Sequence, residues 1–250
     1  VRMSRELVTI KCDLDVELDL ASLEVGEPDH AALRDLFLDL GFRRLAELYT
    51  REALESSALE SPMAEEAAYT LLTEPAEVGR WLEEARAVGR VAIDTETTHI
   101  DPMRARLVGL SLAVSGGRAA YLPFGHRTSS ELTLGLDDAS AEEVPNLPPL
   151  GSEPMAELRA FLGDGEVEKI GHNLKYDLLI LRRAGVELAG ALRDTMVASY
   201  VLDPSRRSHG LDELSMEVLA HKTTSYAEVA GKGRSEIPLA EVALEAARDY

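Results

Sequence analysis

Asp94 and Glu96 are the residues in this sequence whose types and spacing most clearly point to chemistry, and they end the apolar run Val91–Ile93. In a β-strand, residues i and i+2 lie on the same face, so both acids are expected to point to one side at the end of a strand. Two like charges at this separation repel each other unless a cation lies between them. Carboxylate oxygens favour Mg²⁺ or Mn²⁺. The sequence therefore predicts a divalent metal site that includes both residues.

A second acidic segment runs from His172 to Asp177, after an expected strand and at the start of an expected helix. Asn173 is suited to the N-cap position, and Asp177 is a favourable acid in a first helical turn. Capping and metal binding explain this segment equally well when it is taken alone. Tyr250, near the end of a helical pattern, is explained by packing when it is taken alone.

The order of the strands and helices expected around these residues predicts a mixed α/β domain. Expected strands cover 89–95, 106–114, 118–123 and 167–171, with a hairpin turn at Gly116–Gly117 between the second and third. Expected helices cover 76–87, 154–162, 173–184, 195–202, 211–220 and 238–250. Residues 126–150 are polar and contain proline, which is typical of a loop.

The first part of the chain has a different pattern. The run Leu7–Lys11 is typical of a strand, and apolar residues recur at near-helical spacing over residues 29–45. Residues 48–69 are rich in Glu, Ser and Ala, which favours a linker. We therefore expect a partial helical domain over residues 1–47, a linker over 48–69 and the α/β domain over 70–250.

Composition limits the classes of protein that fit. The 250 residues carry a formal net charge of −19 and one cysteine, Cys12, which excludes an internal disulfide and fits a reducing cytoplasm. No apolar run approaches the ~20 residues of a membrane helix. Since nucleic-acid phosphates favour basic surfaces, other parts of a longer protein are expected to supply most of any DNA affinity. The chain begins at Val1 and stops within a helical pattern at Tyr250, which indicates an internal fragment.

The motifs become specific in combination and in order: Asp-x-Glu on a first strand, Asn-x-x-Tyr-Asp on a later helix, then a helix that reaches a Tyr. The sequence resembles the bacterial family A DNA polymerases, of the DNA polymerase I type. Residues from about 70 to 250 resemble their 3′→5′ proofreading exonuclease domain, and residues 1–47 resemble the tail of the preceding 5′-nuclease domain. The resembling segments are Ile93–Thr97 and Asn173–Asp177, with Asp194–Met196, Ser199–Tyr200, Lys222–Thr223 and Ala230–Gly233 between motifs.

The resemblance implies an RNase H-like fold and a mechanism with two divalent ions, Mg²⁺ or Mn²⁺. It implies that Asp94 bridges both ions and that Asp177 serves one of them through water. Glu96 would complete the other site together with an Asp expected four residues beyond Tyr250. Glu96 and Tyr250 would orient the attacking water. Because that last Asp lies past the end of the chain, the isolated piece is expected to be weak or inactive.

The resemblance also implies residues that bind DNA. Ile100 matches a position that wedges between terminal bases, with core packing as the alternative. Tyr226 matches an aromatic residue that stacks on a base, with packing on its own loop as the alternative. His172, Asn173 and Tyr176 would contact the sugar or phosphate, although relatives have Gln at the position of His172.

The resemblance implies a cytoplasmic, monomeric enzyme without a membrane segment, part of a DNA polymerase that acts in replication and repair. Its partners would be a single-stranded or frayed 3′ end of DNA and the polymerase domain of the same polypeptide. A catalytically silent spacer domain is the alternative, against which Asp94, Glu96 and Asp177 argue. A separate RNA-trimming exonuclease is disfavoured by the tail-like residues 1–47.

Overall fold

The computed structural model describes residues 2–13, 26–42, 44–46, 48–50, 68–128, 144–219 and 221–250. The chain divides into two compact units, Val1–Ala53 and Leu54–Tyr250. Most of the expected linker, residues 51–67, lies outside the described residues, as do residues 129–143 of the expected loop.

In the first unit, the described ranges include α1 (Arg2–Val8) and α2 (His30–Asp39), and residues 44–46 and 48–50 are helical as well. The expected strand at Leu7–Lys11 is wrong, because its first two residues end α1 and the rest form no regular element. α2 begins where the Asp29 carboxylate accepts the N–H of Ala32 at 3.0 Å. It ends six residues earlier than predicted, just before Gly41 adopts a left-handed φ of 71°.

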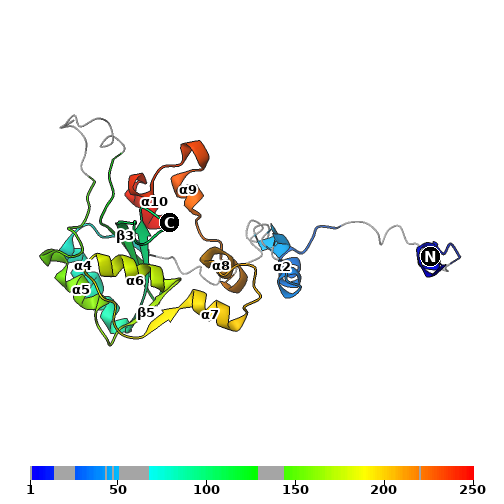
Figure 1. The fold of residues 1–250 in the computed structure, drawn as a ribbon, viewed down its shortest axis with the longest axis horizontal. Helices are drawn as coiled ribbons and strands as arrows, with labels where there is room; N and C mark the ends of the chain where they lie inside the picture. Colours follow the sequence, from blue (N-terminus) through cyan, green and yellow to red (C-terminus); the bar gives the residue numbers. More distant parts are fainter. Residues whose placement is uncertain are drawn as a thin grey trace. The chain divides into compact units, whose positions relative to one another are not determined.

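A six-stranded mixed sheet organises the second unit, in the order β1-β4-β3-β2-β5-β6. Figure 1 labels two of its strands, β3 and β5. The strands are β1 (Ala68–Leu71), β2 (Arg90–Thr97), β3 (Leu107–Val114), β4 (Arg118–Pro123), β5 (Glu168–Gly171) and β6 (Leu192–Asp194). β3 is antiparallel to β2 and β4, whereas β5 is parallel to β2 and β6, and β1 is parallel to β4. The four predicted strands are confirmed. The sequence reasoning missed β1 and β6, which are too short for a period of two to be visible.

Helices and short 3₁₀ turns join the strands. They are α4 (Pro75–Val88), η3 (Glu153–Met155), α5 (Ala156–Leu162), α6 (Leu174–Arg183), α7 (Thr195–Leu202), α8 (Leu211–Leu219), α9 (Tyr226–Ala230), η4 (Gly233–Ser235), η5 (Leu239–Glu241) and α10 (Leu244–Asp249). The predicted helices are confirmed except the last, because the expected helix over 238–250 is divided into η5 and α10. Val242 and Ala243 adopt extended backbone between them.

α4 shows how local sequence fixes an element beside the site strand. Pro75 begins the helix, and Gly89 ends it with a left-handed φ of 75°. Val78, Trp81 and Leu82 recur at the spacing of one helical face and are buried. α4 contacts β2 and α5, and Figure 1 shows α4 beside α5. The first residue of β2 therefore follows directly from a glycine-terminated helix.

The sheet has two unlike faces, and its alternation decides where the acids lie. Val91 and Ile93 of β2 point into the main core, which α4, α5 and α6 cover. Because side chains alternate along a strand, Asp94 and Glu96 lie on the opposite face. There a smaller core gathers around Tyr121 of β4 and includes residues of the carboxyl-terminal segment.

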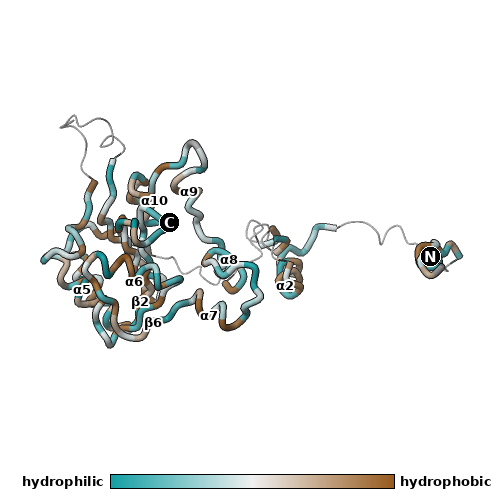
Figure 2. Tube along the Cα trace, viewed as in Figure 1, coloured by the Kyte–Doolittle hydropathy of each residue, from teal (hydrophilic) through white to brown (hydrophobic). Residues whose placement is uncertain are grey.

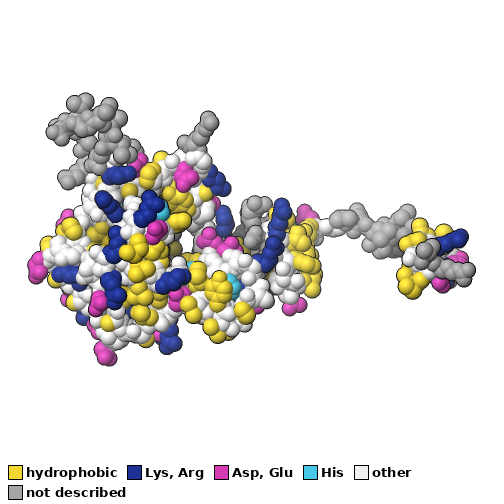
Figure 3. All heavy atoms as spheres, viewed as in Figure 1, with side chains coloured by type: hydrophobic (Ala, Val, Ile, Leu, Met, Phe, Trp, Pro, Cys, Tyr) yellow, Lys and Arg dark blue, Asp and Glu magenta, His cyan; other side chains and the backbone are white. Residues whose placement is uncertain are grey.

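α7 contributes little to either core. α7 is largely hydrophobic (Figure 2), and its apolar side chains are mostly exposed, as the yellow surface over α7 in Figure 3 shows. Ser199 is its buried residue, and the hydroxyl lies 2.8 Å from Nδ1 of His209. In the part of the chain that the structure describes, no helix is long and apolar enough to cross a membrane.

Two leucines on α6 test how the core holds the helix that carries Asp177. Leu181 is fully buried, whereas Leu179 is 40% exposed. Leu181→Ala should lower the free energy of unfolding by about 2–5 kcal/mol because a cavity forms, and Leu179→Ala by about 1 kcal/mol or less. Urea unfolding of both variants measures this difference, and equal losses would contradict the packing described for α6.

Candidate active site

Asp94 and Glu96 lie where β2 runs beyond its parallel neighbour. Pairing between β2 and β5 ends at Ala92 with Ile170, while pairing with β3 continues through Glu96 and Gly109. The last residues of β2 therefore have a neighbouring strand on one edge only. As predicted, the two acids share the sheet face opposite the main core.

Asp177 reaches the free edge of β2 from α6. Its Oδ1 accepts the backbone N–H of Thr95 at 3.0 Å and the Thr95 hydroxyl at 2.6 Å. Asp177 is 2% exposed, and Thr95 is 7% exposed. Because Thr95 lies between the two strand acids in sequence, these bonds fix the third carboxylate next to the other two.

Burial and neighbouring carboxylates oppose the ionisation of Glu96 and Asp177. Burial, followed by the charges of Asp94 and Asp177, raises the pKa of Glu96 to about 8. Burial and the charge of Asp94 raise the pKa of Asp177 to about 6, although the bonds from Thr95 act in the opposite direction. Burial also raises the pKa of Asp94, against the opposing effect of His172. A positive charge among these groups would relieve the repulsion.

The metal-binding prediction concerns these three acids. Within the described ranges, no three His, Cys, Asp or Glu side chains are grouped closely enough to hold one ion. The charges of Asp94 and Asp177 nevertheless act on Glu96, so the three carboxylates are neighbours. The chemistry of the donor set, all carboxylate oxygens, fits Mg²⁺ or Mn²⁺.

Tyr250 and Tyr226 lie beside the acids. Burial, then the charges of Glu96 and Asp94, raises the pKa of Tyr250 to about 12. Its ring meets that of Tyr226 edge-on, with centroids 6.4 Å apart. Tyr226 is 38% exposed, and its hydroxyl donates to the carbonyl oxygen of Ile237 at 3.3 Å. The structure thus brings Tyr250 to the acidic cluster, together with a half-exposed ring.

Ile100 lies in the loop after β2 and points to solvent. It is 92% exposed, which excludes the alternative of core packing. Tyr176 fixes the start of this loop, since its hydroxyl donates to the carbonyl oxygen of His99 and lies 2.6 Å from the Thr97 hydroxyl. Tyr176 therefore has a structural contact that the sequence did not predict.

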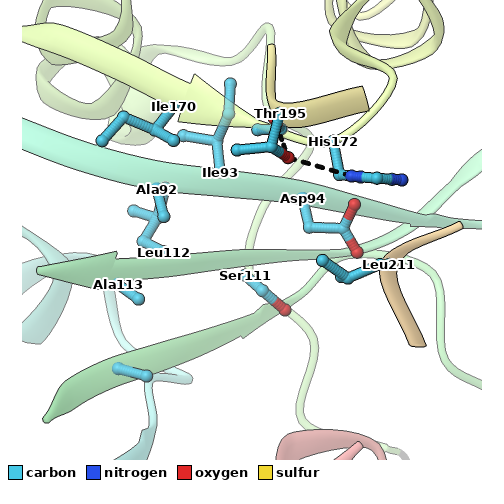
Figure 4. A pocket seen from close by; sticks show the side chains of 12 residues that line it. Ala92, Ile93, Asp94, Ser111, Leu112, Ala113, Ile170, His172, Thr195 and Leu211 are labelled. Atoms are coloured by element: carbon cyan, nitrogen blue, oxygen red, sulfur yellow. Dashed lines mark hydrogen bonds between the residues drawn. The ribbon is translucent and has the colours of Figure 1, made fainter. Parts of the chain in front are cut away.

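His172 borders a cavity of about 290 Å³ beside Asp94 (Figure 4). Its Nδ1 lies 2.9 Å from the hydroxyl of Thr195, which donates to the carbonyl oxygen of Gly171 at 3.1 Å. Small residues of β3 and β4, among them Ala113 and Ala119, line the cavity, so it is mostly apolar. The cavity opens on the sheet face that carries Asp94.

Asn173 holds the N-cap position of α6 without capping through its side chain. Its φ of 64° is left-handed, and its side chain makes no capping hydrogen bond, so the capping prediction is wrong for the side chain. Asp194 caps instead: it accepts the N–H groups of Asn173 at 3.1 Å and Leu174 at 2.8 Å. A residue from a different strand therefore secures the helix that carries Asp177.

Asp194 also caps the helix that follows it. Its Oδ1 accepts the N–H groups of Met196 at 2.9 Å and Val197 at 3.2 Å. Burial opposes its ionisation, but the four backbone donors prevail and lower its pKa. An acid before a helix is a cap signal in the sequence. Its second role at α6 has no local signal, and neither does the contact of Thr95 with Asp177.

Comparison with known sequences identifies relatives of this chain. The profile of a 3′-5′ exonuclease family of A-type DNA polymerases matches residues 69–250. DNA polymerase I of Pseudomonas aeruginosa is 32% identical over 253 residues, which cover 99% of this chain and 26% of that protein. DNA polymerase I of Rhizobium leguminosarum is 38% identical over 192 residues, 73% of this chain and 18% of that protein. The chain thus spans about a quarter or less of these two curated relatives.

Among solved structures, RNase D of Escherichia coli is similar with a TM-score of 0.49 and 20% sequence identity. The similarity covers 72% of this chain and 40% of that protein.

The raised pKa of Glu96 generates a stability prediction for the metal-free protein. Because its pKa rises from 4.5 to about 8, its stabilising contribution is present below 4.5 and is lost as pH rises through about 8. In EDTA at about pH 9, Glu96→Gln should therefore raise the free energy of unfolding by ~1–3 kcal/mol. The exposed Glu83→Gln is the control. A gain for Glu96→Gln that does not change between acidic and alkaline pH would contradict the assigned cause.

Proposed function

Because the chain belongs to the 3′-5′ exonuclease family of A-type DNA polymerases, we propose that it removes nucleotides from the 3′ end of DNA at a site built from Asp94, Glu96 and Asp177. The sheet, with one antiparallel strand among parallel ones and helices on its main face, is the RNase H-like fold of this family. The natural polypeptide would use this activity to edit mismatched ends during DNA synthesis.

One observation carries the proposal: at the open end of β2, the charges of Asp94 and Asp177 act on Glu96, and the charge of Asp94 acts on Asp177. Such an arrangement destabilises the metal-free protein, since each buried negative charge opposes the others. Proteins retain destabilising groups where function requires them. A merely structural role for Asp177 explains its bonds to Thr95 but not the two acids on the other face.

Two Mg²⁺ or Mn²⁺ ions are the proposed cofactors, held by Asp94, Glu96 and Asp177. Bound there, divalent ions would supply a hydroxide at neutral pH and stabilise the leaving 3′-oxygen. The residues contribute the negative charge that selects a cation and the orientation that α6 and β2 impose. Tyr250, next to Glu96, is proposed to orient the attacking water, and its raised pKa keeps the phenol protonated as a donor.

The strand-binding side is proposed to include Ile100, Tyr226, His172, Asn173 and Tyr176. The exposure of Ile100 supports a wedge between bases, and the half-exposed Tyr226 ring supports stacking. Stacking on aromatic rings tolerates any sequence and stabilises each base by ~1–3 kcal/mol. That property suits an enzyme that must remove any terminal nucleotide.

The proposed partners follow from charge and from the relatives. A formal net charge of −19 gives this chain little attraction for DNA phosphates. We propose that the polymerase domain of the same polypeptide supplies most of the affinity and delivers a single-stranded or frayed 3′ end, with the polypeptide acting as a cytoplasmic monomer. The relatives named DNA polymerase I, several times longer than this chain, support this assignment.

Asp94→Ala in the natural polypeptide should reduce 3′→5′ degradation by ~100-fold or more while polymerisation continues. The assay uses 5′-labelled single-stranded DNA with Mg²⁺ or Mn²⁺, and EDTA should stop the reaction. Asp101→Ala, in the loop after β2, is the matched control.

A silent spacer domain predicts a different result. If the folded wild-type protein leaves the labelled strand intact under every condition, the exonuclease proposal is wrong and the spacer function stands. If Asp94→Ala degrades the strand at the wild-type rate, the metal assignment is wrong although the activity is present.

Ile100→Ala should weaken binding of single-stranded DNA by about 50-fold, because about three buried methylene equivalents, each contributing ~0.8 kcal/mol, are lost from the contact. Met103→Ala is the control, since Met103 lies in the same loop and is 66% exposed. Fluorescence anisotropy in Ca²⁺ measures binding without cleavage. Equal affinities for the two variants would remove Ile100 from the binding surface.

A further inference from the structure

The ring of Tyr121 crosses the sheet toward Glu96. Tyr121 is paired with Ser111 on β3, and its hydroxyl lies over Gly109, where an added Cβ would come within 2.0 Å of it. Gly109 is the register partner of Glu96. The phenol therefore ends near Glu96. Burial is the main cause that raises the pKa of Tyr121, and the charge of Glu96 is the second. Only glycine at position 109 leaves room for this arrangement.

His126 connects Tyr121 to the carboxyl-terminal segment. The ring is 5% exposed; its Nε2 lies 2.7 Å from the Tyr121 hydroxyl and its Nδ1 lies 3.1 Å from the carbonyl oxygen of Val242. A carbonyl oxygen only accepts, so Nδ1 carries the proton. Nε2 is then an acceptor, and the Tyr121 hydroxyl donates to it. Burial lowers the pKa of His126, which favours this neutral ring.

Asn146 fixes the backbone of His126 from the other side. Its Oδ1 accepts the His126 N–H at 2.9 Å, and its Nδ2 donates to the His126 carbonyl oxygen at 2.7 Å. The imidazole is thus held by its own backbone and by the Tyr121 hydroxyl. Both of its nitrogens have partners, so its orientation is fully specified.

Val242 is the residue at which the expected last helix is interrupted. Its extended backbone, with φ −71° and ψ 139°, turns its carbonyl away from a helical partner. His126 supplies the missing donor, and Arg127 N–H adds a bond to the carbonyl oxygen of Ala240 at 2.8 Å. α10 begins two residues after Val242 and carries the chain to Tyr250.

We propose that His126 is a positioning residue for the active site: its Nδ1–H anchors the Val242 carbonyl, and so sets the start of α10 and the place of Tyr250 beside Glu96. By donating to Nε2, the Tyr121 hydroxyl favours the His126 tautomer in which Nδ1 carries the proton and can donate to Val242. His126 thus connects two parts of the site: Tyr121, on the sheet face that carries Glu96, and Val242, in the segment that leads to Tyr250. The inference rests on the proposed function for its catalytic meaning, but its structural part stands separately.

Two substitutions at His126 separate its bonds. In His126→Asn, the amide N–H₂ occupies the place of Nδ1 and can still donate to Val242. In His126→Gln, the amide reaches the place of Nε2 and can still accept from Tyr121, but the donor to Val242 is lost. Tyr121→Phe keeps the ring over Gly109 and removes the bond to Nε2. Tyr69→Phe, on β1, is the control for the loss of an exposed hydroxyl.

Amide hydrogen exchange in the natural polypeptide gives a readout that needs no activity. The helical amides of Ala247 and Tyr250 report on α10, and those of Leu110 and Leu112 on β3 report on the core. His126→Gln should speed exchange in α10 by about 3- to 10-fold with no change in β3, whereas His126→Asn should leave α10 near wild type. Equal exchange in α10 for the Asn and Gln variants, or faster exchange in both α10 and β3, would overturn the proposal.

Kinetics test the catalytic consequence. His126→Gln should lower kcat of the exonuclease about tenfold with KM unchanged, because Tyr250 is displaced while the DNA contacts remain. Tyr121→Phe should lower kcat by a smaller factor, and Tyr69→Phe should not change it. A change in KM alone would overturn the positioning role. If the wild type shows no activity, the proposed function fails, while the exchange measurements still decide the anchoring of α10.

Discussion

The bonds from Thr95 to Asp177 are the contact on which the rest of the site depends. Thr95 points into the main core while its two neighbours point away, because side chains alternate along β2. α6 can therefore approach β2 from the side of the main core, and its Asp177 bonds to Thr95 between Asp94 and Glu96, which lie on the opposite face. Both hydrogen bonds are buried, and they tie α6 directly to β2 between the two strand acids.

The acids that this contact gathers act against the fold. Burial and, after it, like charges raise the pKa of Glu96 and Asp177, so the metal-free protein gains stability when these groups hold protons. The large core of the sheet and the three helices on its main face outweigh this repulsion. Among the described residues, no three His, Cys, Asp or Glu side chains are grouped closely enough to hold one ion, and a cation beside the carboxylates would relieve their repulsion. The ionised carboxylates therefore destabilise the site locally, while the sheet and its helices keep the domain folded.

Distant polar groups complete the ends of the elements that carry the site. Asp194 satisfies the first N–H groups of α6, which carries Asp177, and His126 satisfies the carbonyl of Val242, which precedes α10. In each case a backbone group that its own helix leaves unpaired is bonded by a side chain from another strand or loop. Buried backbone groups need partners, so these bonds connect the site to the sheet at fixed points.

The sequence by itself determined the long elements and the acids. The alternation of β2, the helical face of Val78, Trp81 and Leu82 and the glycine turn at 116–117 are local patterns, and local patterns can be read from neighbouring residues. Only the tertiary structure decided that Asp194 rather than the Asn173 side chain caps α6, that a pairing partner turns residues 68–71 into a strand, and that the last helix breaks at Val242. Each of these depends on a hydrogen-bond partner far away in sequence, and the spacing of nearby residues carries no information about such a partner.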